Sequence, residues 1–306
     1  MAAPSEKLAR SLEALKDLQD RGVVAIRSSD LGRIDRERLV TNGFLQAVIK
    51  GWYIPSRPDE IAGESTAWYA AFWDFCAAYL NGRFGTDWCL SPEQSISLHA
   101  GNRTVPPQLL VRSPKGDNKI TELPHGTSLL SVRYNMPEQR DIEIINGLCL
   151  YALVPALIDC SPRFFQQKPT DIRATLATIT DASELLAKLL EGGHTTIAGR
   201  LAGAFRNLGR ERIADDIVAT MRAASYDVRE SDPFGTKRPV IPSDREQSPY
   251  ATRMRILWQA MREPVIEHFP KSPGLTKDIK GYLQHVDGVY VTDAYHSLSI
   301  EGYRVS

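Results

Sequence analysis

The sequence predicts an α+β protein in which a winged helix-turn-helix is followed by a mixed α/β domain and a C-terminal helical segment. Three observations favour this fold class. Leucines recur at helical spacing in the first 21 residues, two alternating apolar segments meet at Lys50-Gly51, and three further strand-like segments lie between residues 108 and 133. The 306 residues are long enough for two or three domains.

Residues 1–58 are expected to form the winged helix. One face of a first helix, over residues 5–21, carries a leucine stripe at three- and four-residue steps: Leu8, Leu12, Leu15 and Leu18. A brief second helix is expected from Ser28 to Leu31, and a third over residues 34–41 that ends at Asn42-Gly43. The segments 44–49 and 52–54 then predict a hairpin, the wing, about Lys50-Gly51.

Residues 59–224 are expected to form a mixed α+β domain. Trp68, Phe72 and Phe75 mark a helix with an aromatic face, and Ser91 caps a second helix that begins at Pro92. Strands are predicted over three segments: 108–112, 119–123 and 128–133. Helices are expected to dominate from about 142 to 224. Gly199 and Gly203, in a helix over 195–208, indicate close helix packing.

Residues 225–249 are expected to be an inter-domain linker, because this segment contains four of the nineteen prolines and little apolar periodicity. The last part, residues 250–306, is expected to be helical. One face of its first helix is expected to carry an apolar stripe, formed by Tyr250, Met254, Leu257 and Met261. The other face is basic and carries Arg253, Arg255 and Arg262. A final helix is expected from Thr292 to about Ile300.

The charge of the chain is balanced overall but segregated along its length. The sequence has 37 basic and 37 acidic residues. Residues 21–58 hold seven Arg/Lys against three Asp/Glu, and residues 200–262 hold twelve against eight. Residues 59–199, by contrast, hold eleven against sixteen. The zero net charge therefore hides a basic N-terminal segment, which is the pattern that nucleic-acid binding requires.

Other features of the composition bear on the compartment. No apolar run approaches the roughly 20 residues needed to cross a bilayer, and the N-terminus mixes charges among its apolar residues, unlike a signal peptide. We therefore expect a cytoplasmic protein that does not contact membranes. The four cysteines form no CxxC pair and predict buried thiols, not a zinc site or a disulfide framework: Cys76, Cys89, Cys149 and Cys160.

The third helix and the wing are the candidate DNA-binding elements. A recognition helix presents side chains to the major groove, and a wing lays a basic tip along phosphates. The third helix carries three cations, Arg33, Arg36 and Arg38, and the wing tip carries Lys50. Operator DNA is therefore the expected partner, bound by a homodimer if the operator is palindromic. The alternative is a protein-interaction scaffold whose arginines are merely solvated.

Residues that could carry catalysis are isolated in the sequence. His99, near the end of the helix SPEQSISLHAG, has no cluster of metal ligands around it and is interpreted as structural, as are His285 and His296. Asp215-Asp216 point about 100° apart on a helix and are interpreted as surface residues. No phosphate-binding loop is present. We therefore predict neither a catalytic site nor a metal site.

An enzymatic alternative is a nucleotidyltransferase-like activity of the middle domain. Such chemistry needs paired carboxylates on neighbouring strands to hold Mg²⁺. The three predicted strands bring only one acidic residue, Glu122. The sequence therefore favours a regulatory protein over this alternative.

Three segments resemble the AbiEi type of bacterial antitoxin and transcriptional regulator, over residues 5–225. They are LQAVIKGWYIPS at the wing, WCLSPEQSISLHAG shortly after it, and the helical run DASELLAKLLEGGHTTIAGRLAGAFRNLGRERIADDIVATM. Such antitoxins bind operator DNA with the winged helix, and their C-terminal part neutralises a partner toxin. The resemblance implies both roles for this chain.

The C-terminal segment TDAYHSLSIEGYRVS is similar to the inhibitory motif of Fic proteins. The resemblance implies that Glu301 is the inhibitory glutamate, that Ser297 fixes its helix and that Gly302 allows close packing. In Fic enzymes this glutamate forms a charge-assisted pair with an arginine that holds the ATP γ-phosphate, and so blocks productive ATP binding. The alternative is a surface glutamate on a C-terminal helix.

The chain departs from the Fic family in one respect, because it contains no His-x-Phe-x-(Asp/Glu)-Gly-Asn-Gly-Arg catalytic core. We therefore expect this chain itself not to be an enzyme and to need no cofactor; ATP and Mg²⁺ are implied only for a Fic core. We expect it to be the N-terminal part of a longer Fic adenylyltransferase, with the core acting in cis. The alternative is a complete regulator that acts in trans, on a Fic core or on a cognate toxin.

Overall fold

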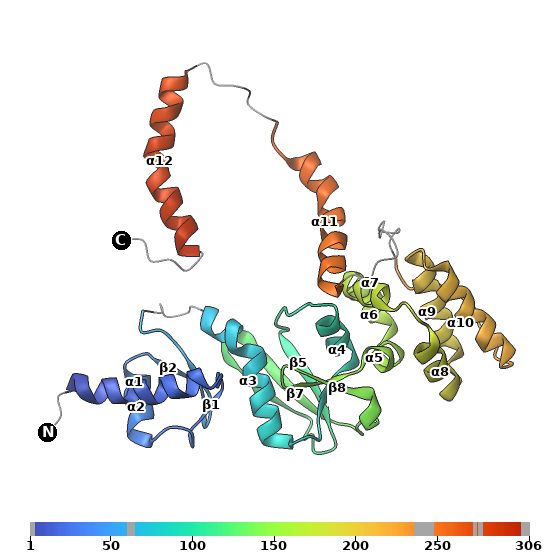
Figure 1. Cartoon of the computed structure of the whole chain (residues 1–306), viewed down its shortest axis with the longest axis horizontal. Helices are drawn as coiled ribbons and strands as arrows, with labels where there is room; N and C mark the ends of the chain where they lie inside the picture. Colours follow the sequence, from blue (N-terminus) through green and yellow to red (C-terminus); the bar gives the residue numbers. More distant parts are fainter. Residues whose placement is uncertain (1–3, 60–64, 236–247, 272–273, 275–277, 301–306) are drawn as a thin grey trace. The chain divides into compact units, whose positions relative to one another are not determined.

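The computed structural model describes residues 4–59, 65–235, 248–271, 274 and 278–300, which form helices and small sheets (Figure 1). The predicted α+β class is confirmed. The chain divides into two compact units, Met1–Gln259 and Ala260–Ser306. The division falls inside a helix and not at residue 249, where the composition indicated the end of a linker.

The N-terminal module consists of two helices and a three-stranded antiparallel sheet. Its elements are α1 (Pro4–Asp20), β1 (Ile26–Arg27), α2 (Arg33–Thr41), β2 (Leu45–Ile49) and β3 (Trp52–Pro55), and the strand order is β1-β3-β2. The predicted hairpin is confirmed: β2 and β3 are antiparallel, and Gly51 between them has a φ of 83° that favours glycine.

A separate hydrophobic core stabilises this module. Leucines at helical spacing on α1 pack against residues of β1, α2 and β2, and the buried set is Leu15, Leu18, Ile26, Leu31, Leu39 and Leu45. Of the predicted leucine stripe, Leu12 is half-buried and packs against this core, whereas Leu8 lies at its margin. The stripe thus fixes how α1 lies on the module.

The expected helix at Ser28–Leu31 is a turn, so that prediction was wrong. The carboxylate of Asp30 accepts a hydrogen bond from the amide of Arg27 at 2.7 Å, and the carbonyl of Gly51 accepts one from the amide of Ser28 at 2.8 Å. Because these acceptors satisfy the amides of Arg27 and Ser28, the segment does not need the hydrogen bonds of a helix. It therefore forms a turn beside the hairpin.

The middle region contains a four-stranded mixed sheet together with α3 (Thr66–Phe84) and α4 (Pro92–His99). The strand order is β4-β5-β7-β6, with bounds Cys89–Leu90, Gln108–Ser113, Ser128–Arg133 and Lys119–Glu122. β5 and β7 are parallel and the other pairs are antiparallel. The three predicted strands are confirmed, as is the cap of α4, where Ser91 Oγ accepts from the amide of Gln94.

A second hairpin replaces a segment that was expected to be helical. Residues 142–151 form β8 (Ile142–Ile145) and β9 (Leu148–Tyr151), which are antiparallel. Asn146 and Gly147, between them, have φ angles of 51° and 77°. Positive φ at both central residues is characteristic of a type I′ turn, for which Asn-Gly is a strong signal. The helical expectation overlooked this dipeptide.

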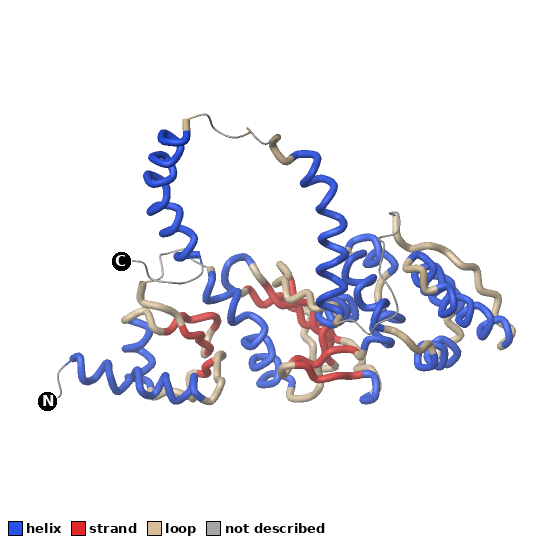
Figure 2. Tube along the Cα trace, turned by 45° about the horizontal axis from the view of Figure 1, so that its top comes forward, coloured by secondary structure: helices blue, strands red, loops and turns tan. Residues whose placement is uncertain are grey.

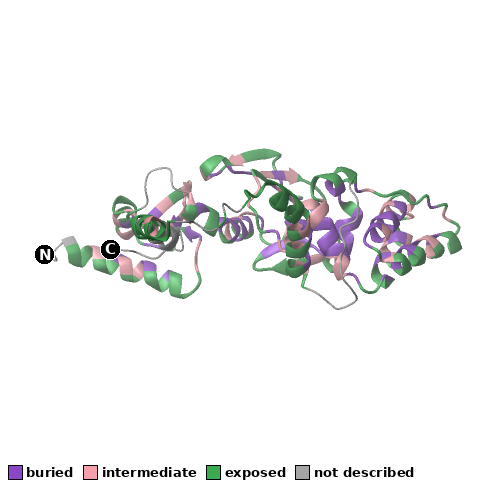
Figure 3. Ribbon diagram, turned by 90° about the horizontal axis from the view of Figure 1, so that it is seen from above, coloured by how far each residue is buried: buried purple, intermediate pink, exposed green. Residues whose placement is uncertain are grey.

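Aromatic residues on α3 fill much of the larger of the two hydrophobic cores, called the main core below. Trp68 and Phe75 are fully buried, and their rings meet edge to face at 5.3 Å. Trp52 of β3 packs against the same helix, with its ring centroid 5.9 Å from that of Phe75. The hairpin of the N-terminal module therefore rests on the middle region. The buried residues are drawn purple in Figure 3.

Helices make up the segment between residues 153 and 223, whereas the strands lie earlier in the chain (Figure 2). These helices are α5 (Leu153–Asp159), α6 (Pro162–Gln167), α7 (Pro169–Thr178), α8 (Ser183–Glu191), α9 (Thr195–Asn207) and α10 (Glu211–Ala223). The expected helix over 195–208 is confirmed. Ile213 and Ile217 of α10 are buried in the main core.

The first part of the expected linker packs against α9. Val228 and Phe234 are buried, and the amide of Ser231 donates to the carbonyl of Gly199 at 3.1 Å. A Cβ at Gly199 would collide with the carbonyl of Arg229, and one at Gly203 would collide with that of Ser231. The two glycines therefore allow an extended backbone segment to approach α9. The sequence predicted close packing of a second helix at this place, and that prediction was wrong. Residues 236–247 of the expected linker lie outside the described residues.

The helix α11 (Pro249–His268) is attached to the middle region through the face opposite its apolar stripe. Thr252 and Ile256 are buried, and Arg253 Nε lies 3.1 Å from Asp171 Oδ1. The carboxylate of Asp171, on α7, also accepts from Ser97 Oγ at 3.0 Å and from Asn102 Nδ2 at 2.8 Å. This buried carboxylate thus gathers three donors and holds the start of α11.

The helix α12 (Ile279–Ile300) begins well before residue 292, its predicted start. Many apolar side chains of α11 and α12 are more than half exposed, among them Met254, Trp258 and Val265 on α11 and Ile279 and Tyr290 on α12. Within the described residues, no helix combines the length and the apolar character needed to span a bilayer.

Candidate functional site

Two of the four predicted DNA-binding residues have freely exposed side chains. Lys50 is exposed at the tip of the hairpin. Arg33, at the start of α2, is 81% exposed and pairs with Glu37 one turn later, with 2.8 Å between Nε and Oε1. The hydrogen bond from Arg33 lowers the pKa of Glu37. Such an exposed pair is weak, so the Arg33 guanidinium can exchange Glu37 for another anion.

The other two arginines of α2 are held by contacts within the module. Arg36 Nη1 donates to the carbonyl of Ser28 at 2.6 Å, and its guanidinium lies 5.7 Å from the ring centroid of Tyr53. Arg38 Nη1 donates to the carbonyl of Lys7 at 2.9 Å and to Ser11 Oγ at 2.8 Å. Arg38 therefore joins α2 to α1, whereas Arg36 joins α2 to the turn and the hairpin.

The predicted inhibitory motif lies at the end of the described chain. Ser297 belongs to α12, but its side chain is outside the described residues. Glu301 and Gly302 also lie outside them. The assignment of these residues to a Fic inhibitory motif therefore stays a prediction.

The isolated histidines and acids are arranged as structural or surface residues. His99 Nε2 donates to the carbonyl of Tyr151 at 2.8 Å and so joins α4 to β9. His285 is exposed, and the side chain of His296 lies outside the described residues. Asp215 and Asp216 are exposed, as predicted, and Asp215 pairs with Arg206 at 2.8 Å. Among the described residues, no group of three or more His, Cys, Asp or Glu is placed to hold a metal ion.

The prediction of buried thiols is confirmed for all four cysteines, which are free and buried. Burial raises the pKa of Cys89 and of Cys160 to about 12 and raises the pKa of Cys76 and Cys149 as well. These thiols are therefore protonated at neutral pH, and none has the character of a nucleophile.

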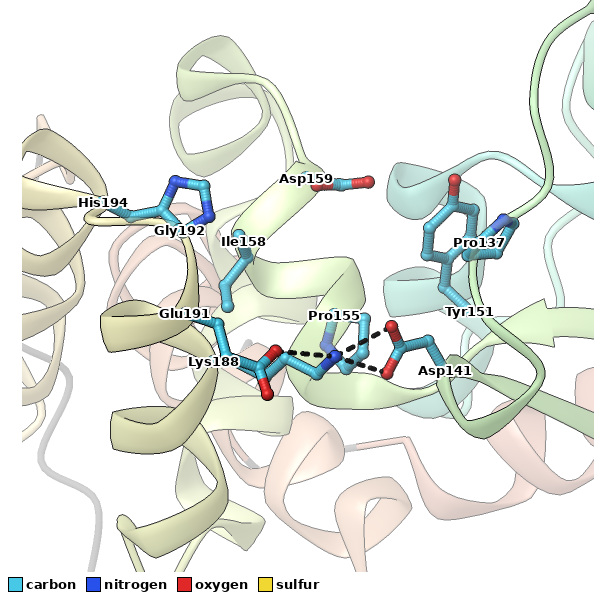
Figure 4. A pocket seen from close by; sticks show the side chains of 10 residues that line it. All are labelled: Pro137, Asp141, Tyr151, Pro155, Ile158, Asp159, Lys188, Glu191, Gly192 and His194. Atoms are coloured by element: carbon cyan, nitrogen blue, oxygen red, sulfur yellow. Dashed lines mark hydrogen bonds and ion pairs between the residues drawn. The ribbon is translucent and has the colours of Figure 1, made fainter.

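A pocket of about 320 Å³ lies between the sheet region and the later helices (Figure 4). Its lining comes from the segment 137–141, from Tyr151 at the end of β9, from α5, and from the end of α8 and the loop before α9. Pro137, Pro155 and Ile158 supply its apolar wall. Pockets of this size hold small ligands and commonly combine apolar walls with a few polar groups.

One side of the pocket is an ion-pair cluster. Lys188 Nζ lies 2.9 Å from Asp141 Oδ1 and 3.4 Å from Glu191 Oε2, so an ammonium is held between two carboxylates (Figure 4). The hydrogen bond with Asp141 raises the pKa of Lys188. Arg140 approaches Glu191 from outside the pocket, at 3.4 Å. The charges of this cluster are therefore largely compensated.

The opposite side carries Asp159, His194 and Tyr151 (Figure 4). Asp159 forms a long ion pair with Arg112, with 3.9 Å between Oδ2 and Nη1. Burial raises the pKa of Asp159, and Arg112 opposes that rise. Arg112 donates its hydrogen bond to the Tyr151 hydroxyl instead, at 2.7 Å, and burial raises the pKa of that tyrosine to about 12.

Comparison of the chain with family models, with curated proteins and with solved structures finds no match. The pocket therefore has to be interpreted from its own residues. Sequence reasoning missed it because Asp141, Asp159, Lys188 and His194 lie in separate segments and form no motif. One signal was available: recognition of the Asn146-Gly147 turn would have predicted β9 and, with it, the placement of Tyr151 at a strand end.

Proposed function

We propose that this chain is a DNA-binding regulator of the antitoxin type whose C-terminal helix is the inhibitory element of a Fic adenylyltransferase. In this proposal the N-terminal module is a winged helix that binds operator DNA. The C-terminal segment binds a Fic catalytic core in cis, or the protein neutralises a cognate toxin in trans. ATP and Mg²⁺ belong to the Fic core and not to residues of this chain.

The observation that carries the DNA-binding half is the exposure of cations on neighbouring elements of the N-terminal module. Arg33 at the start of α2 and Lys50 at the hairpin tip are both exposed, and the segment 21–58 has an excess of basic residues. A recognition helix and a wing need cations at these two places. We assign Arg33 and Lys50 to direct DNA contact and Arg36 to positioning them, because its guanidinium donates to the carbonyl of Ser28. Arg38 has a supporting role, because its guanidinium already bridges α1 and α2.

An electrophoretic shift with the chain's own upstream DNA tests this half. We expect a specific shift at low salt that Lys50→Ala and Arg36→Ala weaken. Arg57→Ala, which removes an exposed cation outside α2 and the hairpin, is the matched control. The absence of a shift at low salt, or a shift that both substitutions leave unchanged, would contradict the proposal and favour a protein-interaction scaffold.

Exposed apolar residues support a protein partner for the C-terminal segment. On α11, side chains at three- and four-residue steps are more than half exposed: Tyr250, Met254, Trp258, Met261 and Val265. A stripe of this kind is typical of a helix that is covered by another protein surface. This support is independent of the motif itself.

The inhibitory half is tested in a protein that joins this chain to a Fic core. Glu301→Gly should raise auto-AMP transfer, because it removes the carboxylate that pairs with the core arginine. Ser299→Ala, on the same segment, is the control and should leave the rate unchanged. If Glu301→Gly behaved like this control, Glu301 would be a surface residue.

A further inference from the structure

The pocket beside α5 contains two polar side chains that make no hydrogen bond within the described part of the chain. The carboxylate of Asp159 is half-exposed, and its only ion pair there is the long one, 3.9 Å, to Arg112. The imidazole of His194 lines the same pocket and makes no hydrogen bond to any described residue. A polar group that lines a pocket without a protein partner is available to a ligand.

Arg112 is positioned by other contacts and does not neutralise Asp159 closely. Its guanidinium lies 4.3 Å from the ring centroid of Tyr134 and donates to the Tyr151 hydroxyl. These contacts fix the position of the guanidinium, which does not line the pocket. The Asp159 side chain is 48% exposed, so it remains accessible to a second cation.

The charge of the lining has the sign that favours a cationic ligand. Three carboxylates line the pocket, from Asp141, Asp159 and Glu191, against one lysine. The single ammonium is already engaged by two of the three, since Lys188 pairs with Asp141 and Glu191. Arg140 adds a second cation beside Glu191, whereas the cation that pairs with Asp159 is Arg112 at 3.9 Å, so an incoming ammonium or guanidinium would be a closer partner for Asp159.

The remaining wall fits a short aliphatic chain. Pro137, Pro155 and Ile158 contribute apolar surface to the same pocket. The volume of about 320 Å³ lies at the small end of ligand pockets. The pocket therefore suits a cation on a stem of a few methylene groups.

We propose that this pocket binds an alkylguanidinium or alkylammonium group, with Asp159 as its counter-ion and His194 as a second hydrogen-bond partner. The same chemistry is presented by a small free cation and by the side chain of an arginine or lysine in another protein. The site joins α5 to the end of α8 and the loop before α9, so an occupant would hold these elements together. This inference does not depend on the proposed DNA-binding or Fic-related roles.

Isothermal titration of the full chain with butylguanidinium and with butylurea tests the site, because the two probes have the same shape and differ in charge. We expect butylguanidinium to bind and butylurea not to. Asp159→Asn should weaken butylguanidinium binding at least about tenfold, as loss of a charge-assisted hydrogen bond implies. Asp216→Asn, an exposed carboxylate on α10, is the matched control and should leave the dissociation constant unchanged.

A second pair of probes distinguishes the two sources of the cation. Binding of N-acetylarginine amide, but not of a heptapeptide with a central arginine, would indicate a free small cation; binding of both would indicate a protein side chain. Either outcome supports the site. Equal binding of butylguanidinium and butylurea, or equal affinities of the Asp159→Asn and Asp216→Asn proteins with circular dichroism showing both folded, would overturn it.

Discussion

The ion pair between Arg253 and Asp171 holds the start of α11, and its removal should release that helix. The carboxylate of Asp171 is 3% exposed and the guanidinium of Arg253 is 23% exposed, with 3.1 Å between Nε and Oδ1. A hydrogen bond to a charged group contributes roughly 1.5–3 kcal/mol. Since Ser97 and Asn102 would still donate to Asp171 in Arg253→Met, we expect a loss of about 2 kcal/mol. This corresponds to a roughly 30-fold shift toward the undocked helix.

Native-state hydrogen exchange, followed by mass spectrometry of a peptide covering residues 250–259, measures this equilibrium. Arg253→Met should speed exchange of these amides roughly 30-fold, because undocking exposes the buried Thr252 and Ile256. Arg262→Met removes an exposed cation from the same helix and should have no such effect. Adding Asp171→Asn to Arg253→Met should restore part of the protection, because no charge is then left buried. Equal exchange in Arg253→Met and Arg262→Met would refute this explanation of how α11 is held.

Three further predictions concern the middle region. Gly199→Ala should lower the free energy of unfolding by about 1–3 kcal/mol, measured by urea denaturation, because the new Cβ collides with the carbonyl of Arg229; Gly235→Ala, where a Cβ meets nothing, should cost far less. Asp159→Asn should raise the melting temperature at pH 7. The pKa of Asp159 is raised in the folded state, so the charged carboxylate destabilises the fold at pH values above that pKa. The gain in melting temperature from Asp159→Asn should therefore disappear as the pH falls below it. A lower melting temperature of the variant at pH 7 would contradict this. The four buried thiols should resist a thiol reagent in the native protein and all react in denaturant, and rapid labelling of the native protein would show that their burial is wrong.

Local signals predicted much of the fold correctly. The hairpin of β2 and β3 follows from alternation around Lys50-Gly51, and the start of α4 follows from Ser91 before Pro92. In each case the residues that fix the geometry lie next to one another in the chain. Such features need no knowledge of tertiary contacts, so a single sequence is enough to predict them.

Features that depend on distant residues were not predictable. The turn at Ser28 forms because the carbonyl of Gly51, far along the chain, accepts its amide. Segment 225–235 looked like a linker from its composition, yet Val228 and Phe234 are buried. Arg38 was grouped with Arg33 by its position on α2, but the acceptors of its hydrogen bonds lie on α1. The pocket likewise draws on separate segments, and only the folded chain brings them together.

The direct test of the proposed function is the salt dependence of binding to the chain's own upstream DNA. Each phosphate contact contributes a slope of about −0.9 to a plot of log K against log salt concentration. If Arg33 and Lys50 contact phosphates, the double substitution Arg33→Ala and Lys50→Ala should make the slope shallower by about 1.8 and weaken binding at low salt. An unchanged slope and affinity in the folded double variant would contradict DNA binding through α2 and the hairpin.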